Sequence, residues 1–201
     1  MAVAWEVTVG EFNRMVIALF VRDVAGLRPE MDPVIPSLKP TVAVRPSIAE
    51  SASVDVPAQW ASWWNELLGL AGSSDGSRRL SLLPQLEFPE LSDRKNLLDL
   101  VNGAAADALE WAQIWKQRYV DFRRQGNWPF GMEQDLIREM TGRRWWHRTP
   151  SFDLRVTVIP VAASRGWRLG REHVLVTEAL MTDIPGYRAW LRPVIAELAD
   201  R

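Results

Sequence analysis

One apolar seam, in residues 93–125, constrains the fold of this chain more than any other feature. Apolar residues recur there at alternating intervals of three and four, which is the pattern of an amphipathic helix that packs like a coiled coil. The seam consists of Leu98, Val101, Ala105, Ala108, Ala112, Trp115, Tyr119 and Phe122. Such a helix spans about 50 Å, whereas a compact domain of this chain length is about 40 Å across. The pattern therefore predicts one long helix, bent near Asn102–Gly103, that packs within the chain or against a second copy.

The N-terminal region fits two local structures. Residues 3–9 alternate between apolar and mixed positions, as in a short strand. Thr8 and Glu11 have the spacing of a capping box, which predicts a helix that runs to about Val24. The apolar stripe of that helix also continues backward through Trp5, so the sequence leaves open whether residues 3–9 form a strand or begin the helix.

Three shorter helices are predicted elsewhere, and prolines mark an irregular segment. One helix face carries three tryptophans after Pro57, a second helix covers residues 132–141, and the last helix begins near Asp183. Prolines concentrate in residues 29–57, where their missing N–H groups exclude a helix or a central strand. This segment is expected to run in an extended form over the surface.

The C-terminal third of the chain changes to the period of strands. Residues 152–158 alternate apolar and polar, and further short runs cover Trp167–Leu169 and Val174–Thr177. Because the connections are short, the sequence predicts an antiparallel hairpin or a three-stranded meander. The expected fold class is α+β, in a single domain of residues 1–201. Its expected parts are the irregular segment 29–57, a mainly helical part at 58–145 with the long helix, and a small antiparallel sheet with a closing C-terminal helix at 152–199.

Composition narrows the classes of protein to which the chain can belong. It has 201 residues, no Cys, a net charge of −1 and a pI of about 6.2. These values exclude a disulfide scaffold, a Cys-based zinc module and a Cys nucleophile, and they argue against a basic protein that coats nucleic acid. The apolar run Met15–Val21 is too short for a membrane span and lies between Arg14 and Arg22. We therefore expect a cytoplasmic protein without membrane contact, and the excess of Arg over Lys indicates a bacterial, GC-rich genome.

The sequence contains no motif that specifies a reaction. It lacks glycine-rich nucleotide-binding loops and the nucleophile elbow of hydrolases. The two histidines, His147 and His173, would need carboxylates such as Asp153 or Glu172 to complete a zinc site. Glu172 and His173 are adjacent, so within a strand their side chains would point to opposite faces. We therefore expect no metal and no cofactor, we name no catalytic residue, and we regard an enzyme as the less favoured class.

Tryptophan and arginine gather in one part of the chain that no helix stripe explains. The chain has 11 Trp, which is several times an ordinary share, and about half of them fit helix stripes. Many of the others lie near residues 128–148, beside a local excess of positive charge. The candidate binding residues are Trp128, Phe130, Arg143, Arg144, Trp145, Trp146, His147 and Arg148.

Three functions are compatible with this aromatic and basic cluster. The leading expectation is a non-enzymatic protein-interaction module that binds an unknown protein partner or a second copy of itself, because exposed aromatic patches are typical of binding surfaces. The second is the binding of a small molecule or sugar in a Trp-lined pocket. The third is the binding of single-stranded nucleic acid through Arg143–Arg148, because Arg contacts phosphates and Trp stacks on bases.

Overall fold

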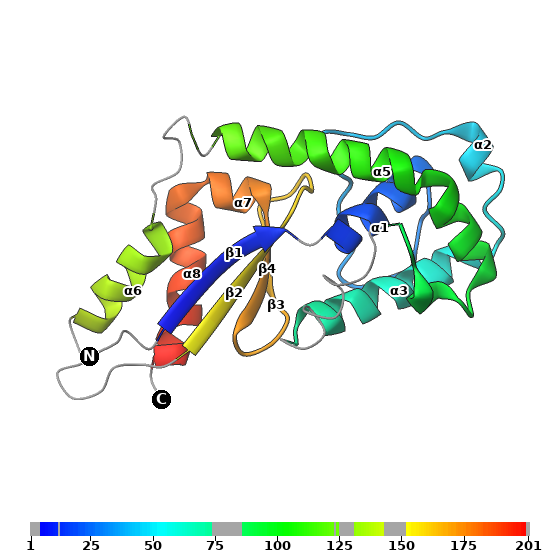
Figure 1. Ribbon diagram of the computed structural model, residues 1–201. Coiled ribbons are helices and arrows are strands. Elements are labelled where there is room, and N and C mark those ends of the chain that lie inside the picture. The colour runs from blue at the N-terminus through cyan, green and yellow to red at the C-terminus, as the bar shows by residue number, and fades with distance from the viewer. Residues whose placement is uncertain are drawn as a thin grey trace.

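The computed structural model describes residues 5–11, 13–73, 86–122, 124, 131–142 and 152–199. The strands are β1 (Trp5–Glu11), β2 (Phe152–Ile159), β3 (Gly166–Arg168) and β4 (His173–Thr177). The helices are α1 (Asn13–Val24), α2 (Pro46–Ala49), α3 (Val56–Ala71), the short 3₁₀ helix η1 (Pro89–Leu91), α5 (Lys95–Phe122), α6 (Met132–Gly142), α7 (Glu178–Thr182) and α8 (Ile184–Ala199). The molecule is elongated, with the sheet towards one end, α1–α3 towards the other, and α5 running along both (Figure 1).

The sheet is mixed, and its strand order is β1-β2-β4-β3. Strands β1, β2 and β4 run parallel, and only β3 is antiparallel, to β4. The α+β class is confirmed, and β3 and β4 form an antiparallel pair as expected, but the sheet as a whole is mixed and not purely antiparallel. The connection of residues 160–172 contains β3, which runs back along the edge of the sheet, so β4 can then start beside β2 in the same direction as β2. The N-terminal strand then pairs with the free side of β2, which no local pattern indicates.

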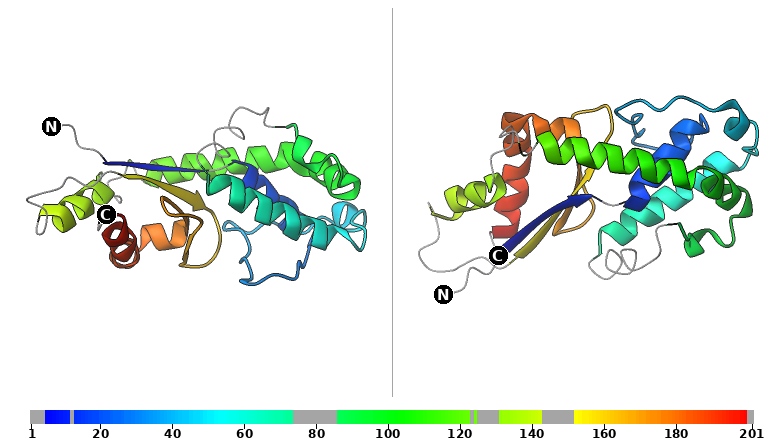
Figure 2. Two further views of the ribbon diagram at one scale, coloured as in Figure 1. Left: turned by 90° about the horizontal axis from the view of Figure 1, so that it is seen from below. Right: turned by 45° about the horizontal axis from the view of Figure 1, so that its top comes forward.

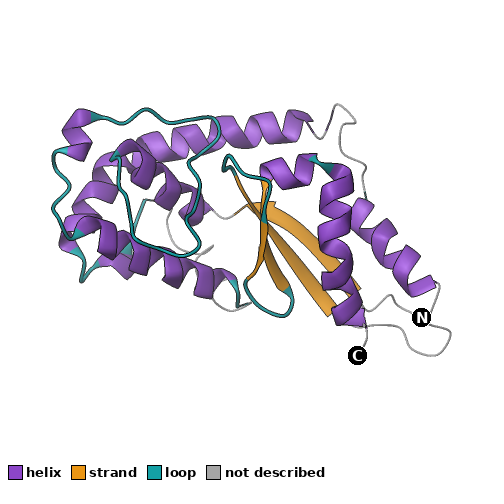
Figure 3. Ribbon diagram, turned by 180° about the vertical axis from the view of Figure 1, so that it is seen from behind, coloured by secondary structure: helices purple, strands orange, loops and turns teal. Residues whose placement is uncertain are grey.

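The two faces of the sheet differ in character. Leu154, Val156 and Val158 are buried on one face, in an apolar cluster that also contains residues of α6, α7 and α8. Figure 3 shows α7 and α8 in front of this face of the sheet. The alternate residues of β2, Asp153 and Arg155, are exposed and half-buried on the other face. The alternation predicted for residues 152–158 is thus present, and the polar face stays accessible near the start of β2.

Helix α1 lies at the centre of the helical part of the molecule. It packs against α5 and α3, and these neighbours are seen in the two views of Figure 2. Ten of its twelve residues are buried, including Arg14 and Arg22. Its middle, residues 15–21, is apolar on all sides, which is typical of a helix in a core. The predicted tryptophan face of α3 is confirmed, because Trp60, Trp63 and Trp64 are fully buried against this core.

The long helix α5 is continuous from Lys95 to Phe122, and its ribbon changes direction in its first third (Figure 1). Six of the eight seam residues are buried, and Leu98 and Phe122 are half-buried. The first part of the seam belongs to the core around α1, and Ala112 and Trp115 belong to the cluster beneath the sheet. The seam therefore packs within one chain, and it provides no free apolar stripe for a second copy.

The alternative left open for residues 3–9 is resolved in favour of a strand. Thr8 and Glu11 both lie in β1, and α1 begins at Asn13. The helix expected from the capping box therefore starts later than predicted. Parallel pairing with all seven register positions of β2 outweighs the local capping preference, since it gives the backbone of residues 5–11 sheet hydrogen bonds.

The proline-rich segment is irregular apart from the single turn α2 and its last two residues, which begin α3. It is held from both sides. Arg22 donates hydrogen bonds of 2.8 Å to the carbonyl oxygens of Ile35 and Pro36, and the Leu38 N–H donates to Asp23 Oδ2 at 2.6 Å. On the other side, the Lys39 N–H donates to the Pro160 carbonyl at 2.8 Å. These contacts bring residues 38–40 beside the end of β2.

Among the residues that the structure describes, none of the helices has both the length and the apolar character that crossing a membrane requires.

Candidate functional site

The predicted aromatic and basic cluster lies outside the described residues. This applies to all eight candidates: Trp128, Phe130, Arg143, Arg144, Trp145, Trp146, His147 and Arg148. The described side chains line several cavities. Two of the cavities lie at the sheet and are lined by charged side chains from several elements.

The larger cavity, which we call the strand-end pocket, has a volume of about 310 Å³. It lies beyond the carboxyl ends of the parallel strands β2 and β4, where α7 begins beneath α5 (Figure 1). In open sheets with parallel strands, ligands commonly bind at this edge. The side chains that give the pocket its chemistry are Lys39, Trp115, Arg118, Phe122, Glu178 and Thr182.

Each wall of the strand-end pocket comes from a different part of the chain. Trp115 and Arg118 come from helix α5, and Glu178 is the first residue after β4. Lys39 comes from the proline-rich segment, where its backbone N–H is bound to the Pro160 carbonyl just after β2. The tertiary fold alone assembles these groups, because residues 39, 115 and 178 are far apart in the sequence.

A buried indole orients the carboxylate of the pocket. Trp115 Nε1 donates to Glu178 Oε2 at 2.8 Å, and the Trp115 ring stacks on Tyr119 with the ring centres 6.1 Å apart. The Trp115 ring is therefore fixed by packing, and its single donor fixes one oxygen of Glu178. Glu178 is half-buried, so its carboxylate is accessible from the pocket.

Two cations line the same pocket. Lys39 and Arg118 are exposed, and no ion pair or side-chain hydrogen bond engages either of them within the described part of the chain. One cavity is thus bordered by two cations without partners in the described residues and by the Glu178 carboxylate, which the Trp115 indole binds. Phe122 and Pro40 add apolar surface. Such groups can bind an anionic group through the cations and a hydrogen-bond donor through the carboxylate.

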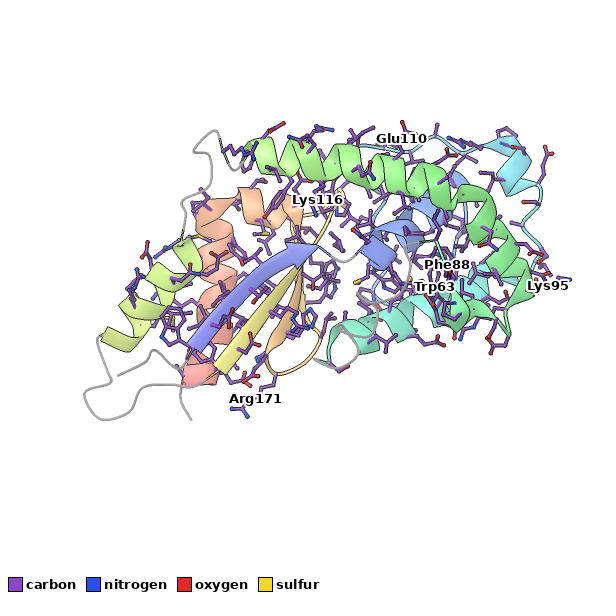
Figure 4. The ribbon with its side chains drawn as sticks, in the orientation of Figure 1. Trp63, Phe88, Lys95, Glu110, Lys116 and Arg171 are labelled. Carbon is purple, nitrogen blue, oxygen red and sulfur yellow. The ribbon has the colours of Figure 1, made fainter. Side chains whose placement is uncertain are left out.

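The smaller cavity, which we call the polar pocket, has a volume of about 190 Å³ and lies on the polar face of the sheet. It is bordered by Gly72 at the end of α3 and by Asp153, Arg155, Arg171, Glu172 and His173. Figure 4 shows the Arg171 side chain extending outward at the lower edge of the molecule, below the loop between β3 and β4. The two cations are balanced by two carboxylates, so the pocket has no net preference for an ion of either sign.

His173 is the most strongly perturbed group of the polar pocket. Its side chain is 3% exposed, and its Nε2 lies 2.7 Å from the Thr157 hydroxyl. Burial, and secondly the positive charge of Arg155, lower the pKa of the imidazole from 6.5 to about 4, against a hydrogen bond to the Ala71 backbone. The ring is therefore neutral at pH 7, and it connects β2, β4 and the end of α3.

We expect the stability of the protein to fall as the pH drops from 6.5 towards 4. The unfolded chain protonates His173 in this window and the folded chain does not, so acid favours unfolding. The loss should be about 2 kcal/mol, since one pKa unit is about 1.4 kcal/mol and solvent in the pocket screens part of the shift. Urea unfolding at several pH values between 7 and 4 measures it.

The matched control for this prediction is His173→Gln, which keeps polar atoms but does not titrate. This variant should be less stable than the native protein at pH 7, and the difference should shrink as the pH approaches 4. An equally steep loss of stability in both proteins would assign the acid sensitivity to other groups.

Among the described residues, no group of three histidine, aspartate or glutamate side chains lies close enough to hold a metal ion. Glu172 and His173 do border the same cavity, although opposite faces were expected. The reason is that β4 begins at His173, so Glu172 lies in the preceding turn rather than in the strand.

Sequence reasoning missed the residues of the strand-end pocket. Trp115 was correctly placed on a buried seam, and the same position also makes it a pocket wall. Glu178 directly follows the predicted strand Val174–Thr177. The signal that would have found it is the parallel direction of that strand, which places the strand end and the residue after it at a ligand-binding edge.

Comparison with models of known protein families, with curated proteins and with solved structures finds no match for this chain. What the protein does is therefore inferred from its own residues.

Proposed function

We propose that the protein binds a small carboxylic acid that also carries a hydroxyl or amino group, in the strand-end pocket. One observation carries this proposal: Lys39 and Arg118, without partners among the described residues, border the same cavity as a Glu178 carboxylate that Trp115 orients. The cations would take the acid group, and Glu178 would accept from the hydroxyl or amino group.

The size of the pocket limits the ligand. Pockets for drug-sized molecules have volumes of about 300–1,000 Å³, and the strand-end pocket, at 310 Å³, is at the lower end of this range. Phe122 and Pro40 offer apolar surface for a short carbon skeleton. These properties favour a small metabolite over a peptide or an oligosaccharide, and they agree with the small-molecule alternative suggested by the tryptophan content.

Thermal shift and calorimetric titration with a ligand panel test the proposal. The panel contains hydroxy acids, amino acids, the corresponding amides and neutral sugars. Acids should bind saturably and raise the melting temperature, as any ligand specific for the folded state does. The amides should bind much more weakly, because they lack the charge that Lys39 and Arg118 recognise. Binding of neutral sugars alone, or of no member of the panel, would contradict the proposal.

The variant Arg118→Gln should weaken the binding of the acid about tenfold, which is the effect of one lost charge-assisted hydrogen bond. Arg138→Gln is the matched control, because Arg138 is exposed on α6 and its ion pair with Asp135 lies outside the pocket. Unchanged affinity in Arg118→Gln, or equal losses in both variants, would remove Arg118 from the site. Glu178→Gln should weaken the binding of amino acids more than that of hydroxy acids, because it removes the charge that attracts an ammonium group.

The protein-interaction function expected from the sequence stays a prediction. One of its supports is lost, because the seam of α5 is buried within the chain. The nucleic-acid alternative rests on Arg143–Arg148, which lie outside the described residues.

A further inference from the structure

Strand β1 forms one edge of the sheet, and within the described ranges only β2 pairs with it. β1 has seven residues, whereas the opposite edge strand, β3, has three. A free edge presents unpaired N–H and C=O groups, and proteins usually protect it by making it short or by placing charged residues, especially Lys, or Pro on it. β1 contains neither Lys nor Pro. The β1 edge therefore has the length and the backbone groups to add a strand (Figure 1).

The side chains of β1 determine which strand fits beside it. Trp5, Val7 and Val9 are half-buried and pack against the apolar cluster between the sheet and α8. Glu6 and Thr8 are exposed on the other face. An added strand has to continue this alternation, with apolar residues on one face and polar residues on the other. It also has to avoid a carboxylate directly opposite Glu6, since like charges in a cross-strand pair are destabilising.

We propose that the added strand is β1 of a second copy of the chain, paired antiparallel about a two-fold axis at Val7. In this register Trp5 lies opposite Val9 of the partner subunit, and Glu6 lies opposite Thr8 of the partner subunit. Opposite residues share a face, so the apolar rows of the two sheets join and no like charges meet. An axis at Glu6 would instead place two carboxylates opposite each other.

The two-fold geometry explains why this assembly ends at a dimer. A two-fold interface uses the same surface on both copies, so the pairing leaves neither β1 edge free to bind a third copy. The resulting eight-stranded sheet has only the three-residue β3 strands at its edges. The strand-end pocket contains no residue of β1, so ligand binding and dimerisation can be tested separately.

Single cysteines test the register, because the chain has none of its own. Mild oxidation of Val7→Cys should give a covalent dimer, since the two thiols face each other at the axis. Val9→Cys is the matched control on the same strand and face. Its two thiols would be separated by four residues, or roughly 13 Å at about 3.3 Å per residue, which is beyond the reach of a disulfide. Equal cross-linking of both variants, or none of Val7→Cys, overturns the proposal.

Charge substitutions at Thr8 test the same register in the reduced protein. Thr8→Glu places a carboxylate opposite Glu6 of the partner subunit, twice in each dimer, and should raise the dimer dissociation constant about fivefold. Thr8→Lys should lower it by a similar factor. Within one chain Thr8 is paired with Arg155, so Thr8→Glu should stabilise the monomer and Thr8→Lys should destabilise it. Changes in monomer stability therefore cannot explain weaker dimerisation of Thr8→Glu and stronger dimerisation of Thr8→Lys.

Sedimentation velocity over a wide range of protein concentrations measures these constants. The double variant Thr8→Glu with Glu6→Lys should restore dimerisation, because it replaces each like-charge pair by an opposite-charge pair. A monomer at every concentration, or an equal response to Thr8→Glu and Thr8→Lys, overturns the proposal.

Discussion

Replacing Trp60 with alanine should lower the free energy of unfolding by about 4 kcal/mol, at the upper end of the range for large-to-small core substitutions. Trp60 is fully buried, and its ring stacks on Trp64 with a centroid distance of 5.5 Å and an interplanar angle of 8°. Its Nε1 also donates to the Ala18 carbonyl of α1 at 2.7 Å. The alanine variant leaves a cavity between α3 and α1 and an indole stack without a partner. Chemical denaturation followed by circular dichroism measures the loss.

Two control variants separate the contributions of Trp60. Trp60→Phe keeps an aromatic ring but removes the donor to Ala18, and it should cost less than half as much as the alanine variant. Val54→Ala should change stability by less than about 0.5 kcal/mol, because Val54 is 99% exposed. If Trp60→Ala and Val54→Ala had similar effects, α3 would not be packed on α1 as described.

The same tryptophan face shows what the sequence can predict. Trp60, Trp63 and Trp64 lie on one helix face because a helix has 3.6 residues per turn, and this periodicity is local information. The seam of α5, the helix α6 and the strands around residues 152–177 follow from local periods in the same way. For these elements the predicted type is correct, and only the boundaries differ.

The pairing of β1 could not be predicted from local patterns. The alternating pattern of residues 3–9 and the capping box of Thr8 and Glu11 overlap at Thr8, and both patterns are short. The strand wins because β2, about 140 residues later in the chain, offers it seven register positions. In a single sequence, nothing in residues 5–11 indicates that they pair with residues 152–158, or the reverse. For the same reason, the sequence does not predict that β1, β2 and β4 run parallel. It therefore does not predict where the strand-end pocket lies.

The burial of Arg14 and Arg22 could not be predicted from local patterns either. In the sequence they bound an apolar run, and arginine is usually exposed. In the structure both are buried within α1. Arg14 forms an ion pair with Glu90 at 2.7 Å, and Arg22 binds Asp23 and two backbone carbonyls. Burial of a guanidinium becomes favourable only when acceptors from distant segments surround it, and those segments, residues 35–36 and 87–90, carry no pattern that identifies them.

Arg22→Met should destabilise the protein by about 3–5 kcal/mol, which is the usual result of removing one partner of a buried ion pair. Methionine can fill the space beside the Trp60 ring, which lies 5.6 Å from the guanidinium carbon. It cannot donate to Asp23, Ile35 or Pro36, so a carboxylate and two carbonyls remain buried without this donor. Arg22→Lys should be intermediate, because an ammonium group keeps the charge but does not span the three acceptors. Equal stabilities of the Met and Lys variants would contradict a role of the charge.

The same substitution should weaken the strand-end pocket, although Arg22 does not line it. Arg22 holds Asp23, Asp23 Oδ2 accepts from the Leu38 N–H at 2.6 Å, and the next residue is the pocket cation Lys39. Arg22→Lys should therefore increase hydrogen exchange at the Leu38 amide and reduce affinity for the acid ligand, while Trp60→Phe, which leaves the Asp23 contact in place, should change neither. Native protection of Leu38 in Arg22→Lys would show that residues 38–40 are positioned by their contacts with residues 160–162 alone.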